Sequence, residues 1–132
     1  MPKNIEILPD TNVVLRYLLR DDPVQYAQAA ELFESVRVGK EKAVILESVL
    51  VECVSILMKF YQVPRQETAE SLSVLLQYKG IANQDQETLI ESLRIFVDRN
   101  LDIVDCIILA RTKRGEGRLF SFDKALNKLQ EK

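Results

Sequence analysis

The sequence predicts an α/β sandwich, in which a short parallel sheet is covered by helices on its faces. Short apolar runs alternate with longer stretches of helical spacing along the chain, and strands separated by helices pair in parallel. The four glycines and four prolines stand at the ends of these segments, and no linker is visible. With 132 residues, 47% hydrophobic and 29% charged, the chain suits one compact domain over residues 1–132.

The first half of the chain contains two predicted strands and three predicted helices. The apolar run 5–8 predicts a strand that ends at Pro9-Asp10, and a helix over 13–19 follows. Asp22 is typical of an N-cap and Pro23 of a first helical turn, and Gly39 is typical of the residue that ends a helix. Residues 43–46 predict a second strand, and a very apolar helix runs from 48 to about 61.

The second half continues the alternation. Helices are expected over 65–79, 86–97, 103–112 and 124–129, and short strands over 80–82 and 118–122. Two of the connections between strands therefore hold paired helices. Since sites in open parallel sheets form beyond the carboxyl ends of the strands, this order points at Asp10 and Asp123, each of which closely follows a strand.

The composition restricts the chemistry that the protein can perform. The chain has no histidine, which excludes histidine-based zinc sites and Ser-His or Cys-His catalysis. Cys53 and Cys106 lie in apolar stretches and are expected to be reduced, buried thiols of a cytoplasmic protein. The N-terminal segment is too short and polar for a signal peptide, and no apolar run reaches the length of a membrane span. The formal net charge of −2 offers no general attraction for nucleic acid.

Two acidic residues interrupt the most apolar segments. Glu52 lies within 49–58 and Asp105 within 103–110, and each is surrounded by hydrophobic residues. A buried, ionised carboxylate loses hydration worth several kcal/mol unless a cation or a donor compensates. Two alternatives remain: Glu52 forms a buried salt bridge or is protonated, and Asp105 is a first-turn acid favoured by the helix dipole. The hypothesis that we favour is a metal site.

Three further acids strengthen this hypothesis when they are combined. Asp10 and Asp123 could be ordinary turn or cap residues, and Asp102 is balanced between helix capping and a metal site. One edge of the sheet would nevertheless bring Asp10, Glu52, Asp105 and Asp123 together. Two carboxylates about 4 Å apart repel by about 4 kcal/mol, so such a cluster needs a shared proton or a cation. Mg²⁺ or Mn²⁺ suits all-oxygen ligation and can activate water against a phosphodiester.

These motifs resemble those of PIN-domain ribonucleases over nearly the whole chain. The resemblance lies in D-T-N-V-V-L-R-Y-L-L, in S-V-L-V-E-C-V-S-I-L, in D-I-V-D-C-I-I-L-A and in F-S-F-D, in this order. It implies a three-layer α/β/α fold and Mg²⁺- or Mn²⁺-dependent RNA cleavage. Asp10, Glu52 and Asp105 would be the core acids, Asp123 the fourth and Asp102 an additional one.

The resemblance also implies supporting residues and partners. Asn12 and Ser121 match polar positions that usually hold the acids in place. The size is similar to that of VapC-type toxins of type II toxin–antitoxin pairs, which implies a homodimer that a small antitoxin protein blocks. The chain departs from many relatives after Asp123, because only nine residues remain where those relatives add a final strand.

The basic residues allow several interpretations. Arg16 and Arg20 lie four residues apart near Asp10 and are candidates for contact with phosphate or with an antitoxin carboxylate. The basic stretch 111–118 is better explained as the C-terminus of a helix, where cations are favoured. Two other functions stay open: a receiver-like signalling domain with an acidic Mg²⁺ pocket, and a catalytically silent binding module with the PIN fold.

Overall fold

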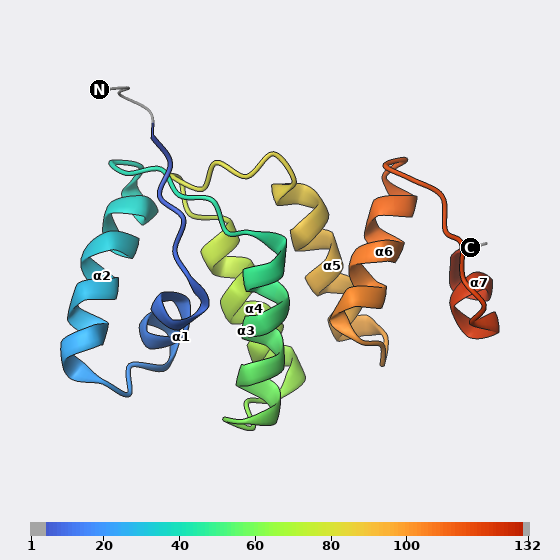
Figure 1. The fold of residues 1–132 in the computed structure, drawn as a ribbon, viewed down its shortest axis with the longest axis horizontal. Helices are drawn as coiled ribbons and strands as arrows, with labels where there is room; N and C mark the ends of the chain where they lie inside the picture. Colours follow the sequence, from blue (N-terminus) through green and yellow to red (C-terminus); the bar gives the residue numbers. More distant parts are fainter. Residues whose placement is uncertain (1–4, 131–132) are drawn as a thin grey trace.

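The computed structural model describes residues 5–130 and contains seven helices in that range. Figure 1 shows them ranged from α1 and α2 at one end of the molecule to α6 and α7 at the other. The helices are α1 (Thr11–Leu19), α2 (Pro23–Val38), α3 (Glu47–Lys59), α4 (Arg65–Leu76), α5 (Gln86–Asp98), α6 (Ile103–Lys113) and α7 (Lys124–Gln130). The predicted helices are thus confirmed, with shifts of only a few residues at their ends.

The ends of the first two helices follow the local chemistry of the sequence. The Asp10 carboxylate accepts a hydrogen bond of 3.0 Å from the backbone N–H of Val13 and so caps α1. Asp22 caps α2 in the same way, with Pro23 in the first turn. Gly39 ends α2 with a φ of 87°, a left-handed conformation that glycine adopts at little cost. The predicted start and end of this helix are confirmed.

The first three predicted strands meet as single parallel bridges. Ala43 pairs with Ile7 on one side and with Ile81 on the other. The pairing cannot extend past Leu8 on its own strand, because Pro9 has no N–H to donate. On the other side, the Asn83 side chain replaces the backbone pairing beyond Ile81. Its amide oxygen accepts from Ile45 N, and its amide nitrogen donates to Ile45 O. These three segments therefore run parallel, but they meet only at isolated bridges, and residues 5–130 contain no regular strand and no confirmed central sheet.

Close packing at the third of these segments requires a glycine. A Cβ on Gly80 would lie 2.1 Å from the backbone oxygen of Glu41 and 2.7 Å from that of Val36. The absence of a side chain lets Gly80 N donate to Val36 O and lets Gly80 O accept from Ala43 N, over 2.7 and 3.0 Å. This approach ties the end of α2 to the bridge at Ala43 and thereby fixes the start of α3.

The fourth predicted strand, 118–122, is not part of the sheet in the described structure. Phe120 and Phe122 are 87% and 93% exposed and contact each other at a ring separation of 5.8 Å. The segment is tethered at both ends, because α7 packs against α6 through the buried Leu126. Figure 1 shows α7 beyond α6, on the far side of the helices from the strand at Ile7. The prediction that this segment joins the central sheet is therefore wrong for the described arrangement.

One continuous core holds the helices together, with Phe33, Leu50, Leu72 and Leu89 among its fully buried side chains. Cys53 and Cys106 are also buried and unpaired, as predicted. Burial raises the pKa of Cys53 to about 12 and that of Cys106 to about 11. Both thiols therefore stay protonated at neutral pH, which suits packing and not nucleophilic chemistry.

The described helices give no sign of a transmembrane segment. Within residues 5–130, none combines the length and the apolar character that crossing a bilayer requires.

Candidate functional site

Three of the predicted acids lie at helix starts. Asp10 caps α1, and the Asp123 carboxylate accepts from Leu126 N over 3.1 Å at the start of α7. Asp102 occupies the N-cap position of α6, but its side chain makes no capping hydrogen bond. All three side chains are exposed. The capping role is therefore present for Asp10 and Asp123, while the Asp102 carboxylate is left free of its own helix.

The expected burial of Glu52 is wrong, because this side chain is exposed. It belongs to a polar stripe along α3 formed by Ser48, Glu52, Ser55 and Lys59. These residues are spaced four, three and four apart, which places them on one helical face. The sequence contained this signal, but the density of hydrophobic residues around Glu52 concealed it. The physical argument that burial makes Glu52 costly therefore does not apply.

Asp105 matches the expectation of a buried carboxylate more closely than Glu52 does. It is partly buried in the first turn of α6, between the exposed Val104 and the fully buried Cys106. The free backbone N–H groups of this turn favour a carboxylate there. Asp105 and Asp102 share a helix face, since they lie three residues apart.

A groove between α3 and α6 joins these acids to a wider surface. Its volume is about 640 Å³. Asp102 and Asp105 line it from the start of α6, and Ser55 and Lys59 line it from the polar stripe of α3. The remaining lining residues are Val51, Val54, Met58, Arg65, Phe96, Ile103 and Val104. The groove therefore combines two carboxylates, two cations and an apolar wall.

Arg65 lines this groove and holds the turn between α5 and α6 in place. Its guanidinium carbon lies 3.9 Å from the centre of the Phe96 ring. Its Nη1 donates to the backbone oxygens of Phe96, Arg99 and Leu101 over 2.8, 3.3 and 3.1 Å. These oxygens belong to the end of α5 and to the turn that leads into Asp102. Sequence reasoning missed Arg65, because nothing local to it indicates contacts more than thirty residues away.

The four predicted core acids are not gathered in the described arrangement. Among residues 5–130, no group of three or more acids, histidines or cysteines lies close enough to hold a metal ion. The expected convergence of Asp10, Glu52, Asp105 and Asp123 is thus absent here. The physical reason is the position of the 118–123 segment, which keeps Asp123 beside α7 and away from the Asp10 end of the sheet.

The predicted supporting residues make local contacts. Asn12 Nδ2 donates to Gln25 on α2 over 3.4 Å and does not contact an acid. Ser121 Oγ accepts from Asp123 N over 2.9 Å, which shapes the turn before that acid. Ser121 therefore stabilises the backbone conformation at Asp123, whereas Asn12 forms a hydrogen bond that links α1 to α2.

The two arginines predicted to contact substrate or partner are engaged within the protein. Arg16 forms an ion pair with Asp21 at 2.9 Å and donates to the Tyr61 hydroxyl over 3.0 Å. These contacts raise the pKa of Arg16, the Tyr61 hydrogen bond most of all. Arg20 lies over the Tyr26 ring, with 5.1 Å between the guanidinium carbon and the ring centre. Few N–H groups of Arg16 are therefore available to bind a phosphate, whereas more of those of Arg20 are available.

Two of the four basic residues in the stretch 111–118 at the end of α6, Arg111 and Arg114, are paired with acids. Arg111 pairs with Glu47 at the start of α3, with Glu116 at 2.9 Å and with Asp85 at 3.5 Å. Arg114 pairs with Glu87 at 2.6 Å. This network joins α3, α5 and α6 at one end and supports the interpretation of residues 111–118 as a helix terminus, not a phosphate site.

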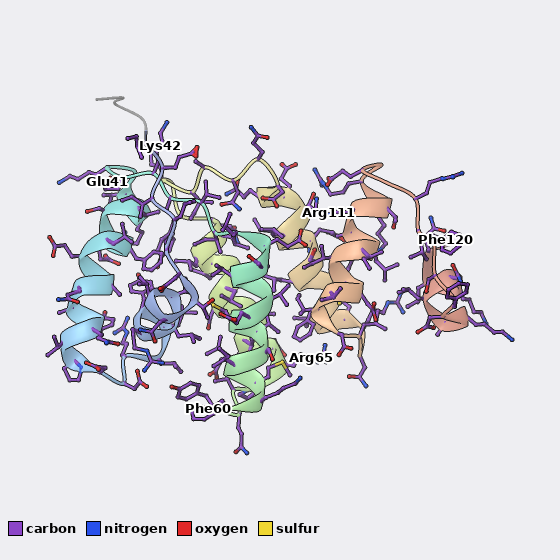
Figure 2. All side chains as sticks on the ribbon, viewed as in Figure 1. Glu41, Lys42, Phe60, Arg65, Arg111 and Phe120 are labelled. Atoms are coloured by element: carbon purple, nitrogen blue, oxygen red, sulfur yellow. The ribbon has the colours of Figure 1, made fainter. Side chains whose placement is uncertain are left out.

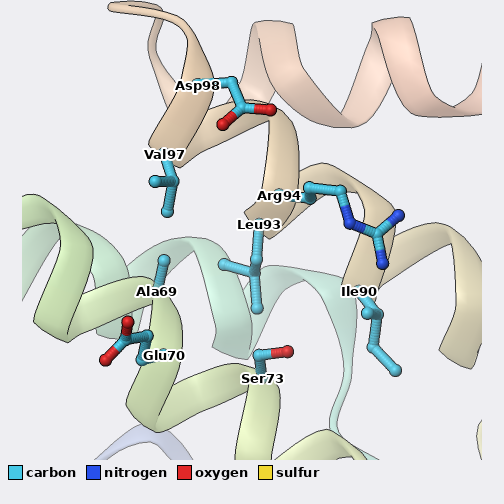
Figure 3. A pocket seen from close by; sticks show the side chains of 8 residues that line it. All are labelled: Ala69, Glu70, Ser73, Ile90, Leu93, Arg94, Val97 and Asp98. Atoms are coloured by element: carbon cyan, nitrogen blue, oxygen red, sulfur yellow. The ribbon is translucent and has the colours of Figure 1, made fainter.

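A smaller cavity of about 210 Å³ lies between α4 and α5. Figure 3 shows Glu70 and Asp98 on opposite helices, with Ala69, Leu93 and Val97 between them. The two carboxylates do not converge, and no predicted site residue lines this cavity. It reflects incomplete packing of α4 against α5.

The parallel bridges, the alternating helices and the acids at helix starts define an α/β domain with carboxylates as its only candidate ligands. Residues 7–132 match the family described as PIN domain, and the chain belongs to this family. PIN domains have an α/β fold and are generally nucleases. No curated protein and no solved structure matches the chain. Membership in the PIN family removes the support for a receiver-like signalling domain.

Proposed function

We propose that the protein is a divalent-metal-dependent ribonuclease whose ligands are Asp10, Glu52, Asp105 and Asp123, with Asp102 as an additional acid. The observation that carries the proposal is the α3–α6 groove, where Asp102 and Asp105 stand at an open helix start beside two cations. The donor set suits Mg²⁺ or Mn²⁺, because all candidate ligands are carboxylates and both thiols are buried. PIN-family membership supports the nuclease activity.

The proposal includes completion of the sheet by the 118–122 segment. The segment at Ile7 pairs with Ala43 on one side. On the other side, the backbone groups of Glu6 and Leu8 have no backbone hydrogen-bond partner among residues 5–130. A parallel strand added at this free edge would place the residues after both strands, Asp10 and Asp123, at the same edge of the sheet. Burial of Phe120 and Phe122 would favour this step by about 3–5 kcal/mol.

Each side chain then has a defined role. In this proposal the carboxylates of Asp10, Glu52, Asp105 and Asp123 would hold the cation. Glu52, the exposed acid of the polar stripe, would also accept a proton from the attacking water. A bound Mg²⁺ or Mn²⁺ supplies an acidified water and neutralises charge on the phosphodiester. Ser121 holds the turn before Asp123 through the Asp123 backbone. Arg65 holds the turn before Asp102.

The direct test is cleavage of single-stranded RNA by the full chain in Mn²⁺, with EDTA as the reference. We expect Asp10→Ala and Asp105→Ala to reduce the rate by at least about 100-fold, as loss of a group that stabilises the transition state does. Asp98→Ala is the matched control, because Asp98 is an exposed acid at the end of α5. Equal cleavage by Asp105→Ala and the parent chain would refute the proposed site.

Amide hydrogen exchange tests the completion of the sheet. We expect amides of 119–122 and of Leu8 to exchange slowly when this strand is docked, because ladder hydrogen bonds protect them. Exchange of 119–122 at the rate of the exposed 115–117 turn would contradict docking. A Phe120→Asp, Phe122→Asp double variant would then leave both exchange and cleavage unchanged.

The biological role that we propose is that of a toxin in a type II toxin–antitoxin pair. The proposal rests on the PIN domain of the chain and on the nuclease activity proposed for it. It includes a cytoplasmic location, a homodimer and inhibition by a small antitoxin protein. A short neighbouring reading frame for a DNA-binding protein that restores growth on co-expression would support it. Expression without growth arrest would count against it.

A silent PIN-fold binding module is the second candidate. The observation that favours it is the lack of a gathered acid cluster within residues 5–130. Isothermal titration with Mn²⁺ separates the two candidates. No binding at millimolar Mn²⁺, with and without RNA, would support the silent module, and saturable binding that Asp105→Ala abolishes would support the nuclease.

A further inference from the structure

The lower end of the α3–α6 groove carries two cations without an acidic partner. Within the part of the chain that the structure describes, neither Lys59 nor Arg65 has a carboxylate oxygen within 4.0 Å. Among the same residues, five arginines, Arg16, Arg37, Arg94, Arg111 and Arg114, are paired with acids, whereas Arg20, Arg99 and Arg118 are also unpaired but do not line this groove. Two uncompensated positive charges therefore face one hollow on a protein whose net charge is −2.

Arg65 is held in place before any ligand arrives. Its stacking on Phe96 and the three hydrogen bonds from Nη1 restrict the guanidinium to one orientation. No hydrogen bond from Nη2 or Nε is present over residues 5–130, and the side chain lines the groove. A guanidinium fixed on one edge and free on the other loses little entropy when it binds an anion. Figure 2 places Arg65 at the lower end of α3, away from Arg111 at the upper end.

The walls of the groove restrict the chemistry of its occupant. Val51, Val54 and Met58 on α3 face Ile103 and Val104 on α6, which makes an apolar wall next to the cations. An anion with an apolar face fits this combination, as a nucleotide does with its phosphate and its base. An acidic peptide fits less well, because Asp102 and Asp105 would repel its carboxylates, whereas a metal ion can bridge these acids to phosphates.

We infer that this end of the groove is a phosphate subsite for single-stranded RNA, in which Arg65 and Lys59 hold a backbone phosphate close to the bond being cleaved. The inference rests on the proposed function and extends it to the position of the substrate strand. Asp105 lines the same groove as both cations. A strand held at Arg65 and Lys59 therefore passes the acid that is proposed to hold the metal, and Ser55 is placed to donate to the same strand.

The deciding variant is Lys59→Gln. Lys59 is an exposed residue in the last turn of α3, and its side chain makes no hydrogen bond within residues 5–130, so we expect its removal to leave the fold intact. Lys113→Gln is the matched control, since Lys113 is an exposed lysine in the last turn of α6 and lies outside the groove. Arg65→Gln is the stronger variant, and thermal unfolding reports whether its contacts with the turn are needed for folding.

Two measurements are made on the full chain with a short single-stranded RNA. Fluorescence anisotropy in EDTA over a series of KCl concentrations gives Kd and its salt dependence. We expect Lys59→Gln to weaken binding about threefold and to lower the slope of log Kd against log salt by about 0.7, the value for one phosphate on a single strand. Arg65→Gln should weaken binding about tenfold. In Mn²⁺, KM should rise for Lys59→Gln with kcat within about twofold, and the titration of this variant with Mn²⁺ should match that of the parent chain.

The outcomes separate this inference from the proposed nuclease. Cleavage by the parent chain with equal Kd and slope for Lys59→Gln and Lys113→Gln would overturn the subsite and favour a protein segment as the occupant. No RNA binding by the parent chain would overturn it as well. RNA binding that depends on Lys59, without Mn²⁺-dependent cleavage, would uphold the subsite and refute the nuclease.

Discussion

The α3–α6 interface has an arginine at each end, and the two arginines have opposite surroundings. The upper end is the region around Arg111 and Glu47, and the lower end is the region around Arg65 and Asp102. At the upper end Arg111 is surrounded by the carboxylates of Glu47, Asp85 and Glu116. At the lower end Arg65 contacts backbone oxygens and an aromatic ring, and no carboxylate lies within ion-pair distance in the described residues. Figure 2 labels Arg111 near the upper end of α6 and Arg65 near the lower end of α3.

The difference separates a structural contact from a surface with capacity left for a ligand. Carboxylates neutralise Arg111, so the upper end is closed to anions. Carbonyl oxygens orient Arg65 but carry no net charge, so its positive potential remains in the groove. Among residues 5–130, the acids of the lower end, Asp102 and Asp105, likewise have no cationic partner within 4.0 Å. Only the lower end keeps charges of both signs available.

The largest expected effect contrasts an acid at each end. Asp105→Asn should reduce Mn²⁺-dependent RNA cleavage by at least about 100-fold, because it removes a proposed ligand. Asp85→Asn should change the rate less than about twofold, since Asp85 accepts from the Asn83 side chain over 3.0 Å and pairs with Arg111 at 3.5 Å, away from the proposed ligands. Steady-state cleavage of a fluorescent RNA measures both. Similar losses of cleavage rate for Asp105→Asn and Asp85→Asn would contradict the proposal that only the lower end takes part in cleavage.

A second prediction contrasts the two arginines in stability. Arg65→Met should lower the free energy of unfolding by about 2–4 kcal/mol, because it removes the stacking on Phe96 and leaves backbone oxygens short of a donor. Arg111→Met should cost about 1 kcal/mol, since its ion pairs are partly exposed to solvent. Urea unfolding followed by circular dichroism measures both values. A larger loss for Arg111→Met would reverse the comparison.

The response to salt offers a third test. Moving from low salt to about 1 M NaCl shortens the Debye length to about 3 Å, so the Arg111 network should lose most of its contribution. The stability difference between Arg111→Met and the parent should therefore shrink. The difference for Arg65→Met should persist, because hydrogen bonds to carbonyls and ring stacking are less sensitive to screening. Unfolding curves at the two salt concentrations decide this.

The smallest expected effect concerns pH at the upper end. The hydrogen bond from Thr88, and then that from Arg111, hold the pKa of Glu116 below its ordinary value of 4.5. This contribution to stability is therefore fully present above about pH 4.5 and is lost as the pH falls through the lower, folded-state pKa. Thr88→Val should move the Glu116 pKa back toward 4.5. An NMR titration of the side-chain carboxyl measures it, and an unchanged pKa would refute the role of Thr88.

Local sequence signals predicted most of the helices and their ends. Asp22, Pro23 and Gly39 mark α2 by capping and backbone conformation that depend on neighbours only. The same local signals failed for burial at Glu52, because whether an apolar helix exposes one stripe depends on what packs around it. They failed again for 118–122, where an alternating apolar run predicts a strand but cannot specify an available partner edge.

The sequence by itself determined the family, the helix boundaries and the restriction to carboxylate chemistry, since these depend on residue types and short spacings. Tertiary structure alone decided which acids are exposed, where Asp123 lies and which arginines are neutralised. The contacts of Arg65 with the turn before Asp102 join residues 31 to 36 positions apart. Such contacts arise from the packing of α4 against α5, and no local pattern in the sequence encodes them.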